Sequence, residues 1–182
     1  MAAPTFTLVQ GVTGWTSAGV YEISNTSGAG AQLSSLTTNI NFSNVNSPQG
    51  YQSSNAFSAA HPVAVGSNSY EFVWGLKVTS IADNAISNFK VWGGGSNPTG
   101  VTVYVGAVAA GSFTTPVTTT STKATTSLVT VSSSSPITVS SSIANTVGTL
   151  SDCVYMQAQT TGSAAGGNQS PMPTVYFSIQ WN

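Results

Sequence analysis

The stretch that decides the fold runs from Ser69 to Trp92 and reads SYEFVWGLKVTSIADNAISNFKVW. In its first half the large apolar residues fall on every second position: Tyr70, Phe72, Trp74, Leu76 and Val78. Side chains two residues apart lie on the same face of an extended chain, so this spacing predicts a β-strand with one buried face. The opposite face carries Glu71 and Lys77, two of the few charged residues in the chain.

After this strand the chain passes Asp83 and Asn84, whose short polar side chains favour a turn. A second apolar run begins at Ile86 and ends at Trp92. We interpret the pair as a β-hairpin or as two strands that belong to neighbouring sheets.

The same alternation returns later in the chain, at 101–105, 154–160 and 175–181. Short strands punctuated by Gly, Pro and Asn, without a convincing long helix, predict an all-β protein, an antiparallel β-sandwich or jelly roll with long Ser/Thr/Gly-rich loops. A chain of 182 residues suits one domain, so we expect a single sandwich over residues 1–182.

Three segments are less regular. Leu33, Leu36 and Ile40 follow helical spacing and favour a short helix, although the surrounding Ser and Thr are weak helix formers. The glycine-rich run 93–100 predicts a loop. Residues 107–142 are rich in Ser and Thr, which fits a disordered linker, but their spaced Val, Leu and Ile favour edge strands or a projecting hairpin.

The composition is unusual in its charge. Only 4% of the residues are charged, against about 25% in ordinary globular domains. Three basic residues and a net charge of −1 cannot neutralise a row of phosphates, so we expect no nucleic-acid binding. A net charge near zero also removes repulsion between copies and so favours association.

The residues that carry most enzyme and metal chemistry are scarce. The chain has one histidine, His61, and one cysteine, Cys153. Zinc needs three or four His, Cys or carboxylate ligands, and a catalytic triad here would depend on a histidine in a polar loop with no acid near it in sequence. We therefore expect no enzymatic activity, no cofactor and no metal.

Four charged residues gather in and near the opening stretch: Glu71, Lys77, Asp83 and Lys90. Nothing near them in sequence completes a catalytic site. An isolated charge that is partly buried needs a partner, so we expect structural ion pairs between strands, with Glu71 reaching a lysine on a neighbouring strand such as Lys90.

Aromatic residues supply the candidate contact surface. Trp74 and Trp181 are in phase with apolar neighbours, which predicts core positions. Trp15 lies between glycines, Trp92 stands at a strand end beside the glycine run, and Tyr51 lies in a long polar connection. We expect these three residues, Trp15, Tyr51 and Trp92, at an interface.

Several stretches together resemble a protein family: the run from Asn68 to Trp74, then ISNF at 86–89 with Val91 and Trp92, and the closing FSIQW strand at 177–181. They are similar to the decoration, or cement, proteins and other auxiliary structural proteins of tailed-bacteriophage heads. The resemblance implies a small β-sandwich or jelly roll on a capsid lattice, bound to the major capsid protein and to copies of itself, often as trimers. It brings no catalytic residues.

The prediction is therefore a non-enzymatic structural subunit of a virus particle, made in the host cytoplasm and placed on the capsid surface. No run of about 20 apolar residues predicts a membrane span, and from the residues Met1 to Pro4 we expect no signal peptide. Two alternatives remain open: a lectin-like carbohydrate-binding module that uses the exposed aromatic residues, and a filament or tail subunit that donates the segment from Thr5 to Val12 to the sheet of its neighbour.

Overall fold

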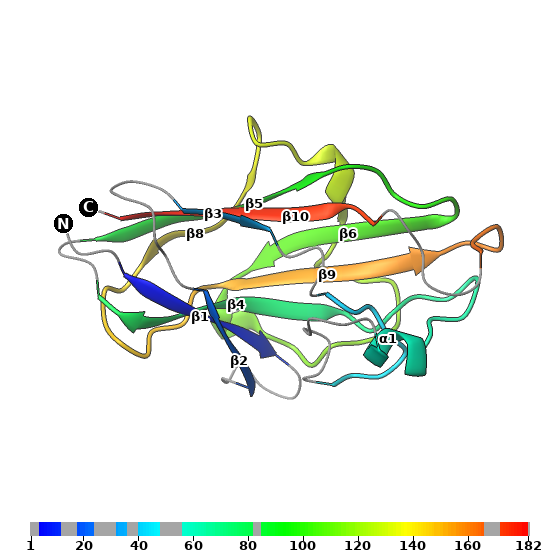
Figure 1. Ribbon diagram of the computed structural model, residues 1–182, viewed down its shortest axis with the longest axis horizontal. Helices are drawn as coiled ribbons and strands as arrows, with labels where there is room; N and C mark the ends of the chain where they lie inside the picture. Colours follow the sequence, from blue (N-terminus) through cyan, green and yellow to red (C-terminus); the bar gives the residue numbers. More distant parts are fainter. Residues whose placement is uncertain are drawn as a thin grey trace.

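The computed structural model describes residues 4–11, 18–23, 32–35, 40–47, 56–81, 85–165 and 172–181, and for 18–23, 32–35 and 56–57 it describes the backbone path. Within these ranges the protein is an antiparallel β-sandwich (Figure 1), which confirms the predicted fold class. The larger sheet has six strands in the order β2-β1-β4-β9-β6-β7, and the smaller has four in the order β3-β10-β5-β8.

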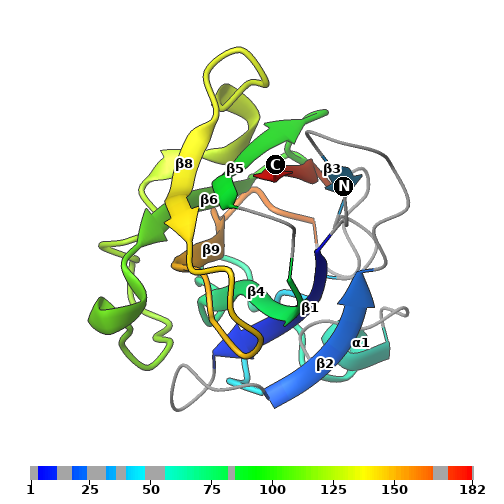
Figure 2. The same cartoon turned by 90° about the vertical axis from the view of Figure 1, so that its left-hand side faces the viewer.

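The strands of the larger sheet are β1 (Thr5–Gly11), β2 (Ala18–Ile23), β4 (Phe72–Ser80), β6 (Val101–Val108), β7 (Thr126–Ser127) and β9 (Cys153–Thr160). Those of the smaller sheet are β3 (Gln32–Ser35), β5 (Ile86–Gly94), β8 (Ile137–Ile143) and β10 (Thr174–Trp181). Short helical turns lie between strands: α1 (Ala56–Ala60), η2 (Ala110–Ser112) and η3 (Leu128–Thr130). Figure 2 shows the strands of both sheets arranged around a common interior.

The quoted stretch forms β4 and β5, which lie in different sheets. It is therefore a pair of strands from neighbouring sheets and not a hairpin. From β4 onward the chain crosses between sheets at nearly every connection, because β5, β8 and β10 belong to the smaller sheet while β6, β7 and β9 belong to the larger. The turn predicted at Asp83 and Asn84 falls outside the described residues.

The centre of the core is an aromatic cluster that joins the two sheets. Trp74 of β4 makes edge-to-face contacts with Phe89 of β5 at 5.8 Å and with Phe177 of β10 at 5.9 Å between ring centroids. Phe89 and Phe177 meet each other at 6.2 Å. All three rings are buried, and this edge-to-face geometry adds stabilisation beyond burial of apolar area. The alternation in the sequence thus directs the Trp74 side chain into the interior, where it contacts the smaller sheet.

The irregular segments differ from expectation in two places. Gln32–Ser35 pairs with β10 as a strand, so the helical spacing of Leu33, Leu36 and Ile40 is misleading. The strand β5 also continues into the glycine run as far as Gly94. A Cβ on Gly93 would lie 2.2 Å from the carbonyl oxygen of Leu128 in η3, so the missing side chain lets η3 close over the strand.

Two further segments bear on the sequence hypotheses. The Ser/Thr-rich region 107–142 contains β7 and all but the last residue of β8, and these two are the edge strands at one end of each sheet. Thr5–Gly11 forms β1, which pairs with β2 on one side and with β4 on the other. The strand that a donation mechanism would give away is therefore paired at both edges within its own chain.

Candidate interaction site

The most distinctive surface of the described structure is the segment 109–125, here called the Thr-rich loop, which connects β6 to β7. It crosses the outer face of the larger sheet and covers a second, small core made of Val73, Ala124, Cys153 and Tyr155. Figure 2 shows this segment outside β6 and β9, on the left of the molecule. These four side chains are consequently buried beneath the loop.

Close approach of the loop to the sheet depends on Gly106 in β6. A Cβ at this position would lie 1.9 Å from the carbonyl oxygen of Lys123. Only a residue without a side chain leaves room for the loop backbone at this point. The loop therefore rests directly on the strand.

A buried polar network fixes the loop from below. The carboxylate of Glu71, which is 5% exposed, accepts hydrogen bonds from the Ser121 hydroxyl and from the Val117 amide. The side chain of Gln157, which is fully buried, accepts a hydrogen bond from the Ser121 amide at 2.9 Å and donates one to the Thr119 carbonyl at 2.9 Å. Hydrogen bonds to a charged acceptor are stronger than those between neutral groups, so this network anchors the loop at several points.

Tyr155 and Lys123 fix the first part of the loop. The Tyr155 hydroxyl donates to the Thr114 carbonyl at 3.0 Å and accepts from the Thr114 amide at 2.9 Å. The Lys123 ammonium lies 4.7 Å from the centroid of the Tyr155 ring and donates a hydrogen bond to the Thr114 hydroxyl. A cation over an aromatic face is attracted by the ring quadrupole, so the one charged residue of the loop is also engaged with the sheet.

Two titratable side chains beneath the loop, Cys153 and Tyr155, have raised pKa values. Burial, followed by the nearby charge of Asp152, raises the pKa of Cys153 to about 12. Burial is also the main cause of the raised pKa of Tyr155. Because the thiolate is the nucleophilic form, the buried Cys153 thiol is a poor nucleophile near neutral pH.

The exposed residues of the loop are uncharged and most carry hydroxyl groups, while Lys123 is half-buried. Eleven of its residues are exposed: Ala109, Gly111, Ser112, Thr114, Thr115, Val117, Thr118, Thr119, Thr120, Thr122 and Thr125. The side chain of Val117 is 41% exposed. Its backbone makes two hydrogen bonds to Glu71: the Val117 amide donates to the Glu71 carboxylate, and the Val117 carbonyl accepts from the Glu71 amide. The loop thus presents neutral side chains on a fixed backbone.

The predicted ion-pair residues have separate locations. The partners of the Glu71 carboxylate are the Ser121 hydroxyl and the Val117 amide of the Thr-rich loop, where a lysine was expected. Lys77 lies on β4 opposite Thr7, and Lys90 lies on β5, where it is paired with Ser178 of β10. Asp83 falls outside the described residues.

Of the predicted interface residues, Trp92 is described and Trp15 and Tyr51 are not. Trp92 is half-buried on the outer face of the smaller sheet and stacks on Tyr176, its register partner in β10, at 5.9 Å between centroids and 19° between planes. The sequence analysis missed Tyr176. Its alternation with core residues shows that it points outward, but only the pairing of β5 with β10 places it beside Trp92.

His61 adjoins α1 and accepts a hydrogen bond from the Asn44 amide through its carbonyl oxygen. The described part of the chain holds no group of three or more His, Cys, Asp or Glu side chains that could bind a metal ion. It also has no helix with the length and apolar character needed to cross a membrane.

Comparison with family models, with curated proteins and with solved structures finds no match for this chain.

Proposed function

We propose that this protein is a non-enzymatic structural subunit of a virus particle, a decoration protein that binds the major capsid protein and stabilises the head lattice. The observation that carries the proposal is the Thr-rich loop: an uncharged, hydroxyl-bearing surface whose backbone is fixed to the larger sheet by Glu71, Gln157 and Tyr155. This surface has the properties of a preformed contact site.

Rigid presentation matters because binding costs conformational entropy wherever a loop must become ordered. The buried network has already ordered this loop, so that part of the cost is met during folding. Threonine hydroxyls can donate and accept hydrogen bonds, which suits a wet, neutral interface. On a repetitive lattice, many weak contacts of this kind act together through multivalency.

The test is reconstitution. Virus particles stripped of this protein are mixed with the purified chain, and bound protein and the temperature of particle rupture are measured. We expect saturable binding and a higher rupture temperature. Failure to bind, or binding without any gain in heat resistance, contradicts a decoration role.

A matched pair of variants assigns the contact to the Thr-rich loop. Thr118→Lys places a charge on the exposed loop surface, and Thr99→Lys places the same charge on the exposed turn between β5 and β6. We expect Thr118→Lys to reduce binding at least tenfold and Thr99→Lys to bind as the unmodified chain does. Equal binding by both variants shows that the loop is not the contact surface.

A second candidate, carbohydrate binding, is favoured by the stacked pair of Trp92 and Tyr176, which remains half-exposed on the smaller sheet. Aromatic side chains of this kind offer a large apolar contact area with a polar edge. The measurement is glycan-array binding, which Trp92→Ala should abolish and Thr99→Ala should not change. Absence of any glycan binding by the unmodified chain excludes this candidate.

A further inference from the structure

A second polar site lies away from the Thr-rich loop, where the end of β1 meets the segment 40–47 and the start of β4. Gln10 of β1 is 4% exposed, and its Nε2 donates a hydrogen bond to the Ser47 carbonyl at 2.8 Å. That bond fixes the orientation of the amide, because the flipped amide would place Oε1 against a carbonyl oxygen. Its Oε1 is buried and has no hydrogen-bond partner.

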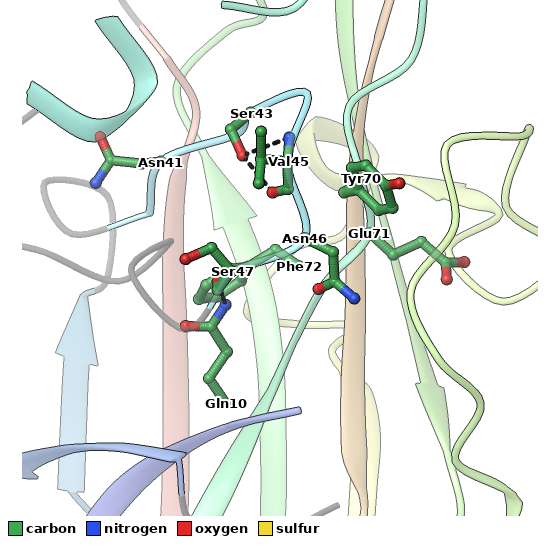
Figure 3. A pocket seen from close by; sticks show the side chains of 9 residues that line it. All are labelled: Gln10, Asn41, Ser43, Val45, Asn46, Ser47, Tyr70, Glu71 and Phe72. Carbon is green, nitrogen blue, oxygen red and sulfur yellow. Dashed lines mark hydrogen bonds between the residues drawn. The ribbon is translucent and has the colours of Figure 1, made fainter. Parts of the chain in front are cut away.

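Among the residues that the structure describes, one other buried side-chain atom lacks a hydrogen-bond partner, Nε1 of Trp74, and its location is different. Trp74 lies in the aromatic cluster of the core, whereas Gln10 borders a small polar cleft. Figure 3 shows its amide beneath Ser47, within this cleft. Buried acceptors are almost always satisfied by protein or by ordered water. We therefore expect a hydrogen-bond donor for Oε1 of Gln10 within the cleft.

The cleft has a volume and a polar lining that suit one water molecule. Its cavity volume is about 10 Å³, close to the minimum that holds one water. The walls include buried Asn41 and Ser43, together with Asn46 and Ser47. A buried water needs two to four polar partners, and Figure 3 shows Ser47 next to the Gln10 amide while Asn41 and Ser43 lie farther along the cleft.

A cation fits the same cleft poorly. The carboxylate on its wall belongs to Glu71, whose two oxygens accept hydrogen bonds from the Thr-rich loop, and Figure 3 shows this side chain directed away from Gln10. The remaining polar side chains that line the cleft are neutral. Hard cations in proteins rely on carboxylate ligands, so a neutral hydrogen-bond donor is the better occupant.

We propose that this cleft binds one ordered water molecule, which donates a hydrogen bond to Oε1 of Gln10 and joins β1 to the segment 40–47. The same segment is held to the rest of the fold by bonds from Tyr70 N to Ser43 O at 2.9 Å and from Asn44 N to His61 O at 3.1 Å. The water therefore completes the attachment of this segment to the larger sheet. This inference does not depend on the proposed function.

The test is a high-resolution crystal structure of the full chain, with parallel soaks in rubidium chloride and manganese chloride, whose cations scatter anomalously. We expect a water peak at hydrogen-bond distance from Oε1 of Gln10 and no anomalous signal in the cleft. An empty cleft, an anomalous peak, or a protein donor on this oxygen overturns the proposal. All of these outcomes are observed with the unmodified protein, so the test does not require that any variant fold.

Two variants test the assignment to this oxygen. Gln10→Met has a side chain of similar length without the acceptor, and we expect the water peak to be lost. Gln180→Met makes the same change at an exposed glutamine that accepts a hydrogen bond from Asn88 at 2.5 Å, and we expect the peak to remain. Retention of the water in Gln10→Met shows that Oε1 does not hold it and overturns the assignment.

Discussion

Adding one methyl group to Gly106 should dislodge the Thr-rich loop. In Gly106→Ala the new Cβ would lie 1.9 Å from the Lys123 carbonyl oxygen, and real Cβ atoms essentially never come within 3.0 Å of another heavy atom. The loop backbone must therefore move by about 1 Å or more, which disturbs the adjoining bonds from Ser121 to Glu71 and Gln157. Overpacking of this kind costs about 3 kcal/mol, equivalent to a fall of about 6–12 °C in Tm for a chain of this size.

Gly111→Ala is the matched control, because no heavy atom lies within 4 Å of its Cβ and the position is exposed in η2. Thermal unfolding followed by circular dichroism, with urea titration for the free energy of unfolding, compares the two variants. We expect Gly111→Ala to stay within about 0.5 kcal/mol of the unmodified protein, as surface substitutions usually do. Equal stability of the two variants would show that the loop does not pack directly on β6, and it would contradict the preformed contact surface.

Three further predictions concern the residues beneath the loop. Glu71→Ala leaves the Ser121 hydroxyl and the Val117 amide without their acceptor and should lower the free energy of unfolding by about 3 kcal/mol in urea titration; no loss of stability contradicts the network. Because its pKa is about 12, Cys153 should resist a thiol-specific reagent at pH 8 until the protein unfolds; equally rapid labelling of the native and urea-unfolded protein contradicts its burial. The raised pKa values of Cys153 and Tyr155 mean that the unfolded chain loses protons first as pH rises, so the free energy of unfolding should fall from about pH 9 upward. Cys153→Ala should reduce that slope, and an unchanged slope contradicts the contribution of the thiol.

The local sequence pattern was sufficient to predict the strands that have one buried face. The alternation around Trp74 and in the closing run to Trp181 predicts which side chains enter the core, because side-chain direction in a strand has a period of two. The same reasoning fails where spacing matches a helix by chance, as at Leu33, or where a glycine run continues a strand, as at Gly93. In those places pairing with β10 and contact with η3 determine the backbone.

The sequence by itself determined the all-β class, the aromatic core positions and the scarcity of charge, since each depends on composition or on neighbouring residues. Only the tertiary structure decided the partners of Glu71, which lie 46 and 50 residues away in the Thr-rich loop, and the contact between Trp92 and Tyr176. The physical reason is the antiparallel sandwich itself. Its hydrogen-bond register and the crossing of connections between sheets join residues distant in sequence, and no local periodicity contains that register.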